Sequence, residues 1–190
     1  MAEPLGTHDA QVHATARSVL DFWFGLTREQ HFAKDDALDH EIATRFGTLR
    51  DDLLAAEAAG WRDHSDTLLA AVIVLDQFSR NIHRGTAQAF AADDLAIALT
   101  LQAISIVWDT AMTVDKRAFL YLPLEHAEDT RLQALSVEKF TALGDADYLG
   151  FAKAHAAVID RFGRFPSRNA ALRRTSTPAE EDWLAAGGGW

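Results

Sequence analysis

Hydrophobic residues recur at intervals of three and four positions along most of this chain, which is the period of an amphipathic α-helix. The pattern is clearest in three segments, residues 12–24, 35–59 and 145–162. Asp35 is suited to be the N-cap of the second segment, and a glycine follows each of the three. We expect Gly25 to end the first helix as a left-handed cap, Gly60 to end the middle helix and Gly163 to be the C-terminal cap of the third.

Shorter segments between these also favour helices. They are predicted from Ser65 or Asp66 to residues 81–85, from Thr86 to about Trp108, from Thr113 or Asp115 onward, over residues 136–143, and from Thr177 to residues 187–189. Thr177-Pro178-Ala179-Glu180 combines a capping box with proline at the first helical position. Pro123 is expected either to kink its helix or to open a new one.

No segment alternates between hydrophobic and polar residues with a period of two, so no β-strand is predicted. The sequence therefore predicts an all-α fold of seven to nine helices. We expect one domain over residues 1–190, with residues 1–11 and 187–190 loose. The short connections favour antiparallel helical hairpins. A chain of 190 residues buries roughly 70% of its unfolded surface, so its core does not need disulfides or a bound metal ion for stability.

Composition narrows the classes of function. A net charge of −10 argues against nucleic-acid binding, which depends on neutralising phosphates with lysine and arginine. The absence of cysteine excludes disulfides and thiolate metal sites. Residues 1–13 have no features of a signal peptide, and the most apolar later run, residues 95–108, is too short to span a bilayer. We therefore expect a cytoplasmic protein without a nucleic-acid or membrane partner.

Three groups of polar residues are candidates for a functional site. The first continues the apolar stripe of the helix that begins near residue 65, and it comprises Asp76, Gln77, Arg80, Asn81 and Arg84. Asp76 and Arg80 lie four positions apart and so share a helix face. One interpretation is a buried structural ion pair. The other is an arginine that Asp76 holds in place and presents to an anion.

The second group follows Pro123 and comprises Glu125, His126 and Glu128. Glu128 is expected to point inward, because it falls on an apolar stripe with Leu124. Acids after a proline suit the positive end of a helix dipole, which is the structural interpretation. Carboxylate and imidazole together also suit a divalent metal or proton transfer, although the spacing matches no established metal motif.

The third group is basic and includes Arg161, Arg164 and Arg168, which alternate with Phe162 and Phe165. These arginines either complement the carbonyl end of the preceding helix or form a preorganised anion-binding edge. His155 lies on the apolar stripe of that helix. A lone core histidine is more often hydrogen-bonded structure than a ligand, unless it faces His126 or Glu128 in space.

Several motifs together carry a resemblance to a known family. They are Leu75-Asp76-Gln77-Phe78, Arg80-Asn81, Arg84-Gly85-Thr86, Pro123-Leu124-Glu125-His126 with Glu128-Asp129, and Arg161-Phe162-Gly163-Arg164-Phe165-Pro166. In these motifs the chain resembles the uncharacterised bacterial domain-of-unknown-function family nine-two-four over nearly its whole length. The resemblance implies a helical fold similar to tetratricopeptide repeats, with degenerate repeats. It implies no established activity, substrate or cofactor.

The favoured hypothesis is a binding module for an anionic small molecule or an acidic peptide, with no cofactor and no metal. The expected ligand-binding residues are Asp76, Gln77, Arg80, Asn81, Arg84, Glu125, His126, Glu128, Arg161, Arg164 and Arg168. One alternative is a metal-assisted hydrolase that uses Glu125, His126 and Glu128, with His155 as a possible fourth group. Another is a scaffold that binds a protein partner through an apolar surface. The favoured hypothesis assumes that the three polar groups meet in space.

Overall fold

The computed structural model describes the backbone of residues 5–189 and the side chains of residues 9–189, and this part of the chain contains helices and no strand. The elements are α1 (Leu5–Phe24), α2 (Arg28–Phe32), α3 (Asp36–Ala55), α4 (Ser65–Ile73), η1 (Val74–Phe78), α5 (Ser79–Ile82), η2 (Ala87–Phe90), α6 (Asp93–Ser105), η3 (Trp108–Ala111), α7 (Val114–Glu125), α8 (Thr130–Leu143), α9 (Ala146–Phe162), η4 (Pro166–Arg168) and α10 (Pro178–Ala185). The all-α prediction is confirmed.

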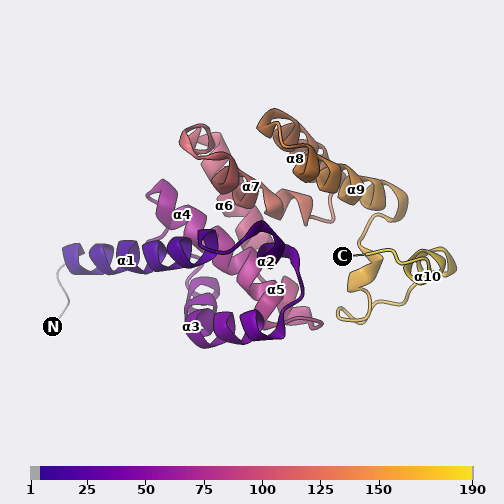
Figure 1. The fold of residues 1–190 in the computed structure, drawn as a ribbon, viewed down its shortest axis with the longest axis horizontal. Helices are drawn as coiled ribbons and strands as arrows, with labels where there is room; N and C mark the ends of the chain where they lie inside the picture. The colour runs from indigo at the N-terminus through magenta and orange to yellow at the C-terminus, as the bar shows by residue number, and fades with distance from the viewer. Residues whose placement is uncertain (1–4, 190) are drawn as a thin grey trace.

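The helix from α4 through η1 to α5 is unbroken and runs through the centre of the molecule (Figure 1). Its first part packs against α1 and α7, and its second part packs against α3. All residues from Thr67 to Ser79 are buried, which explains why this segment is almost wholly apolar. The core therefore forms around this helix, and the polar residues near its end are held inside the fold.

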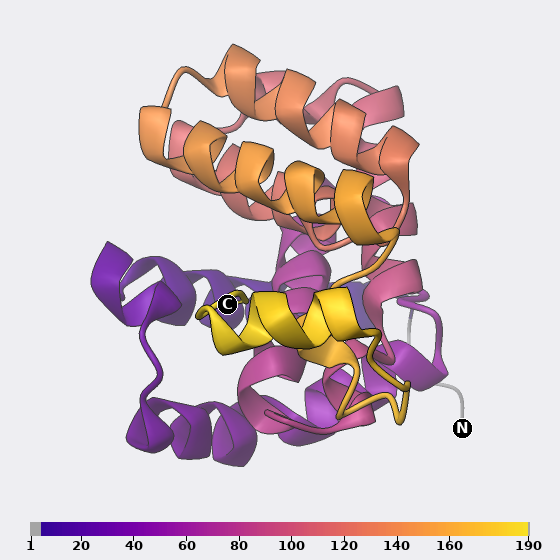
Figure 2. The same ribbon diagram turned by 90° about the vertical axis from the view of Figure 1, so that its right-hand side faces the viewer.

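Helices α7, α8 and α9 pack one against the next, and Figure 2 shows α8 and α9 side by side at one end of the molecule. Only Gly144 and Asp145 connect α8 to α9, so these two helices form an antiparallel hairpin as expected. The degenerate tetratricopeptide-like repeats stay a prediction. None of the helices within residues 5–189 has the length and apolarity that a membrane crossing requires.

The local capping signals are largely confirmed. The side chains of Asp35, Thr113 and Asp145 each accept a backbone hydrogen bond at the N-terminus of α3, α7 and α9. Gly163 caps α9 with φ of 70°, and Thr177 forms the expected capping box of α10. These elements depend on residues adjacent in sequence, which is why the sequence predicts them well.

Besides the end of α3, which comes at Ala55 rather than next to Gly60, four local predictions are wrong. Helix α1 begins at Leu5, so residues 5–11 are helical rather than loose, while residues 1–4 lie outside the described part. Gly25 is not left-handed; its added Cβ would instead lie 2.9 Å from the carbonyl oxygen of Asp21, so the turn requires glycine for space. Thr86 precedes only the short 3₁₀-helix η2, and α6 begins separately at Asp93.

The fourth concerns Glu125, which was expected at the start of a helix that follows Pro123. Pro123 lies inside α7, whose last residue is Glu125. Glu125 and His126 therefore sit at the carbonyl end of a helix, where the dipole does not favour negative charge. The helix-dipole explanation therefore does not apply to Glu125.

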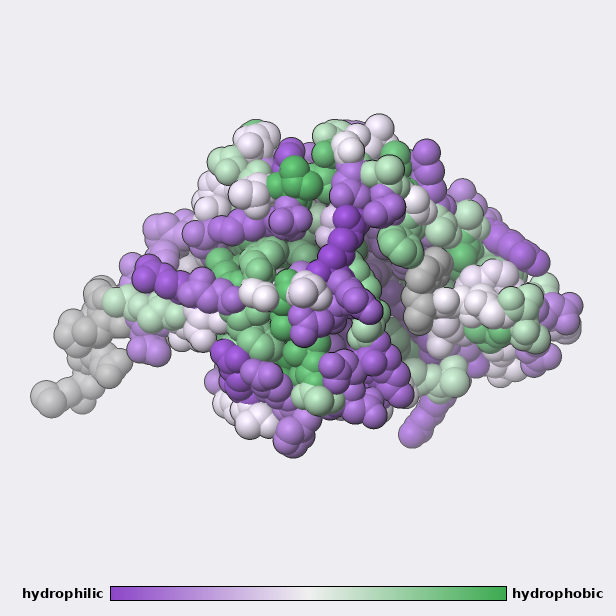
Figure 3. Space-filling model, viewed as in Figure 1, coloured by the Kyte–Doolittle hydropathy of each residue, from purple (hydrophilic) through white to green (hydrophobic). Residues whose placement is uncertain are grey.

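Figure 3 shows hydrophilic side chains over much of one face of the molecule, with hydrophobic side chains exposed between them. Two of the exposed hydrophobic residues are Phe32 on α2 and Phe151 on α9, which are 52% and 49% exposed. Their rings stack with centroids 6.5 Å apart, although they are far apart in sequence. They form an apolar rim beside the polar residues described next.

Candidate functional site

The end of the central helix meets the end of α7 through Asp76 and His126. The ring nitrogen Nδ1 of His126 lies 2.9 Å from Oδ1 of Asp76, and the amide of Gln77 donates to Oδ2 at 2.6 Å. Asp76 is fully buried, and it lies in the π-helical turn η1. Such turns are rare and occur often at functional sites. The first two predicted groups therefore converge.

The basic group joins this meeting point through Arg168. The guanidinium of Arg80 lies 2.9 Å from Asp76 and donates two hydrogen bonds to Asp93, at 3.0 and 3.1 Å. Arg168 donates to Asp93 at 3.2 Å and to the backbone carbonyl of His126 at 2.8 Å. The carboxylate of Asp93 thus connects arginines from the central helix and from the C-terminal segment.

Glu125 faces His155 on α9. Nδ1 of His155 donates to the carbonyl of Phe151 at 2.9 Å and lies 3.2 Å from Oε1 of Glu125. The rings of His155 and His126 have centroids 6.0 Å apart. His155 therefore faces His126, which is the condition under which the sequence analysis included it in a site. The second carboxylate oxygen, Oε2 of Glu125, is buried and has no hydrogen-bond partner.

Burial shifts the protonation of these groups. It raises the pKa of Glu125 to about 8, an effect that the charge of Asp76 reinforces. It lowers the pKa of His155 to about 3, with the charge of His126 acting the same way, and it also lowers the pKa of His126. Burial alone would raise the pKa of Asp76, but the charges of Arg80 and His126 outweigh it and hold that pKa well below its usual range.

Two cavities meet at this cluster. The first, of about 390 Å³, is lined by Gln77 and Glu125 on one side and by the apolar rim of Phe32 and Phe151 on the other. The second, of about 340 Å³, is lined by Arg168, Phe90 and Phe165 among others. Both volumes are in the range of small-molecule sites. The residues common to both cavities are Arg80, Arg84, His126 and His155.

Asn81 and Arg84 line the first cavity but are held by an acid outside it. The amide of Asn81 donates to Asp39 at 2.7 Å, and Arg84 donates to both carboxylate oxygens of Asp39 at 2.7 and 2.8 Å. These contacts fix the orientation of both side chains at the edge of the cavity. They engage Nε and Nη2 of Arg84, whose side chain is 40% exposed.

The structure does not bring Glu128, Arg161 or Arg164 to the cluster. Glu128 lies in the loop between α7 and α8, where it accepts from the backbone N–H of Phe165 and pairs with Arg174 at 2.6 Å. Its side chain is 25% exposed, so it does not point into the core as expected. Arg164 pairs with Glu180 in the capping box of α10 at 2.7 Å. Arg161 is exposed and lies over the ring of Phe162.

Two acidic residues that hold the arginines of the site, Asp93 and Asp39, are not among the residues predicted from the sequence. Asp93 is in the first turn of α6, and Asp39 is in the first turn of α3, and both positions are ordinary for acids at helix starts. No local signal distinguishes them from other such acids. Their partners lie far along the chain, 75 positions for Asp93 and Arg168 and 45 for Asp39 and Arg84.

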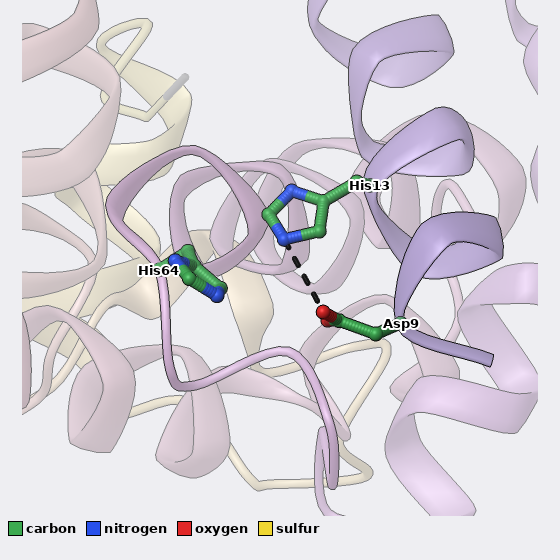
Figure 4. Close-up of side chains that lie close together, drawn as sticks. All are labelled: Asp9, His13 and His64. Carbon is green, nitrogen blue, oxygen red and sulfur yellow. Dashed lines mark ion pairs between the residues drawn. The ribbon is translucent and has the colours of Figure 1, made fainter. Parts of the chain in front are cut away.

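The side chains around this centre also form a group with metal-ligating chemistry. One ligand atom from each of Glu125, His126 and His155 lies within 4.8 Å of the other two. A second such group within the described residues is Asp9, His13 and His64, between α1 and the loop before α4. Figure 4 shows the ring of His13 turned toward Asp9, at 3.6 Å, with His64 nearby. This second group is largely solvent-exposed.

Comparisons with known proteins place the fold in a family. The family model described as "Bacterial protein of unknown function (DUF924)" matches residues 19–188. The chain is also similar to a solved structure of a protein of unknown function from Agrobacterium tumefaciens. The two are 38% identical with a TM-score of 0.88, and the match covers 93% of this chain and 99% of that one. Among curated proteins, none matches this chain.

Proposed function

The chain belongs to the bacterial family DUF924, and on that premise we propose that it binds an anionic small molecule in the two cavities that meet at Arg80, Arg168 and His126. The other predicted functions require other features. A peptide-binding module or a protein scaffold calls for an extended groove or a large apolar face. These cavities of about 340 and 390 Å³ suit a small molecule instead.

The observation that carries the proposal is the environment of Arg168. Its side chain is only 12% exposed, and its guanidinium lies 4.6 Å from the ring centroids of both Phe90 and Phe165. The guanidinium of Arg168 donates to one carboxylate oxygen of Asp93. Arg80 donates to both oxygens of the same carboxylate. Burial lowers the pKa of Arg168 to about 10, with the charge of Arg80 acting in the same direction. A buried arginine that shares its carboxylate partner with a second arginine is only partly neutralised. Such a site favours the binding of an anion from solution.

The rest of the cavity suggests how the ligand is built. The rim of Phe32 and Phe151 is apolar, and Leu122 extends that surface inward. Arg84 also lines this cavity, and its side chain is 40% exposed. A molecule with a carboxylate or phosphate group and a small apolar body would satisfy both sides. An acidic peptide would leave most of its length outside these volumes.

The test is a thermal-shift and calorimetric titration of the untagged protein with inorganic phosphate and with benzoate, a small aromatic carboxylate. A ligand at about 100 times its dissociation constant adds roughly 2.7 kcal/mol to the free energy of unfolding. We expect at least one probe to raise the melting temperature, and the effect to weaken as ionic strength rises. Absence of a shift from both probes overturns the proposal.

Matched variants assign the effect to the cavity. Arg168→Gln removes the buried cation, whereas Arg161→Gln removes a cation from the same basic segment that is exposed and lines neither cavity. We expect only the first to lose the anion response. If Arg168→Gln lowers stability too far, Arg84→Gln replaces it, because Arg84 is 40% exposed. An equal response in all variants contradicts a site at these arginines.

A further inference from the structure

We propose that Glu125, His126 and His155 bind a divalent transition-metal ion such as Zn²⁺. Two imidazoles and one carboxylate are a common ligand set for Zn²⁺ and for non-haem Fe²⁺. The three residues come from two helices that pack together, because Glu125 and His126 end α7 and His155 lies on α9. This proposal does not depend on the anion, since the ion would bind whether or not a small molecule does.

The separations are close to those of a formed site. Ligand atoms about 2.1 Å from a tetrahedral ion lie about 3.4 Å from one another. One ligand atom from each of Glu125, His126 and His155 already lies within 4.8 Å of the other two.

The supporting contacts match those around bound metals. A metal-ligating histidine usually donates its other N–H to a carboxylate or a backbone carbonyl, which fixes the ring and its tautomer. His126 has this arrangement with Asp76 through Nδ1, so its Nε2 is the nitrogen it offers to an ion. Nδ1 of His155 is likewise held by the carbonyl of Phe151.

Glu125 supplies a separate observation. The residue is 2% exposed, and its Oε2 atom is buried without a hydrogen-bond partner. A buried polar atom without a partner costs roughly 1–3 kcal/mol, so native structures retain few of them. Glu125 also lines the first cavity, with His126 and His155. A cation between these three side chains would satisfy the orphaned oxygen.

Three protein ligands leave one position of a tetrahedral ion open, as in catalytic rather than structural zinc sites. Because His126 and His155 line both cavities, that position faces the cleft. Glu128, which the sequence suggested as the third ligand, is instead occupied by Arg174. The predicted metal set is therefore revised by replacing Glu128 with His155.

The exposed group of Asp9, His13 and His64 is the competing place for an added metal ion (Figure 4). It lacks the buried carboxylate that supports a histidine ring in the interior group. A surface histidine pair can still bind Zn²⁺ weakly, so every titration uses His64→Ala as the background. That substitution lies outside both cavities and outside the proposed site.

The experiment is isothermal titration calorimetry of the untagged, chelator-treated His64→Ala protein with Zn²⁺, together with the visible absorption of added Co²⁺. We expect one equivalent to bind and the Co²⁺ spectrum to indicate nitrogen and oxygen ligands. Asp76→Asn should weaken Zn²⁺ binding by about 10–100-fold through the lost support of His126, and Glu125→Gln should weaken it more. Glu128→Gln is the matched control and should leave Zn²⁺ affinity unchanged.

Failure of the metal proposal can be distinguished from failure of the anion-site proposal. If His64→Ala protein binds no stoichiometric Zn²⁺, the metal proposal is overturned regardless of how any other variant folds. Equal Zn²⁺ affinity in Glu125→Gln and Glu128→Gln overturns it as well. Neither outcome bears on the response of Arg168→Gln to phosphate or benzoate, which tests the anion site alone.

Discussion

Asp76 and His126 are 50 positions apart in the sequence, and their side chains meet at 2.9 Å in the fold. The contact joins the π-helical turn of the central helix to the carbonyl end of α7. Asp76 is fully buried, and it also lies 2.9 Å from Arg80. One carboxylate thus compensates a buried arginine and orients a histidine at the cleft.

Asp76→Asn should therefore be strongly destabilising. Removing one partner of a buried ion pair costs at most roughly 3–5 kcal/mol, and here Asp93 still compensates part of the charge of Arg80. Urea denaturation measures the loss. Glu41→Gln is the control, because Glu41 pairs with Arg45 at 2.8 Å and both side chains are exposed, at 52% and 40%. An exposed pair contributes at most about 1 kcal/mol, so similar losses in the two variants would contradict a buried network.

Glu180 should make the C-terminal segment sensitive to acid. The hydrogen bonds of Arg164 and of the backbone N–H of Thr177 lower its pKa from 4.5 to about 2. Because the folded pKa is the lower one, this stabilisation is present above pH 4.5 and is lost as the pH falls toward 2. Glu180→Gln should lower the melting temperature at pH 7, and its difference from wild type should shrink toward pH 2. Glu181→Gln, one position along on the exposed face, should match wild type throughout.

Two glycines should respond in opposite directions to alanine. An added Cβ at Gly25 would lie 2.9 Å from the carbonyl oxygen of Asp21, so Gly25→Ala should cost roughly 1–3 kcal/mol. Gly47 lies inside α3 with no atom within 4 Å of an added Cβ, so Gly47→Ala should stabilise by about 0.5–1 kcal/mol. Denaturation midpoints at an unchanged m-value measure both effects. If both substitutions changed the free energy of unfolding by the same amount in the same direction, helix propensity alone would govern these positions.

The contrast between Gly25 and Gly163 also explains what the sequence could predict. Both follow an aromatic helix end, and only Gly163 is left-handed. A helix cap such as Thr177 depends on neighbours within four residues, so the local sequence is sufficient to predict it. The choice at Gly25 depends on how the chain enters α2, a five-residue helix too short to show a period. The π-helical turn at Asp76 likewise has no sequence pattern of its own.

The candidate site was predictable in its members but not in its pairings. Asp76, Arg80 and His126 stood out because charged residues fell on an apolar stripe or beside a proline. Which arginines join them depends on tertiary contacts. Arg168 reaches Asp93 across 75 positions, whereas Arg164 is engaged by Glu180 only 16 positions away. Nothing in the composition of the basic segment separates these two arginines.

The most direct probe of the cluster is the pH dependence of stability between pH 6.5 and 8. Burial raises the pKa of Glu125 from 4.5 to about 8, so the folded protein keeps a proton that the unfolded chain has lost. Stability should therefore fall as the pH rises through this window, by at most about 1.4 kcal/mol per pH unit. The lowered pKa values of His126 and His155 give the opposite slope, but only below their ordinary value of 6.5.

Chelator-treated Glu125→Gln should lose this slope, because glutamine does not titrate, even though its absolute stability differs from that of wild type. Urea denaturation at half-unit pH intervals from 6.5 to 8 measures both proteins. Glu128→Gln is the control and should keep the wild-type slope, because Arg174 and the backbone N–H of Phe165 lower the pKa of Glu128 against its burial, so that it is ionised throughout the window. Parallel curves for wild type and Glu125→Gln would mean that Glu125 is already ionised in the folded protein.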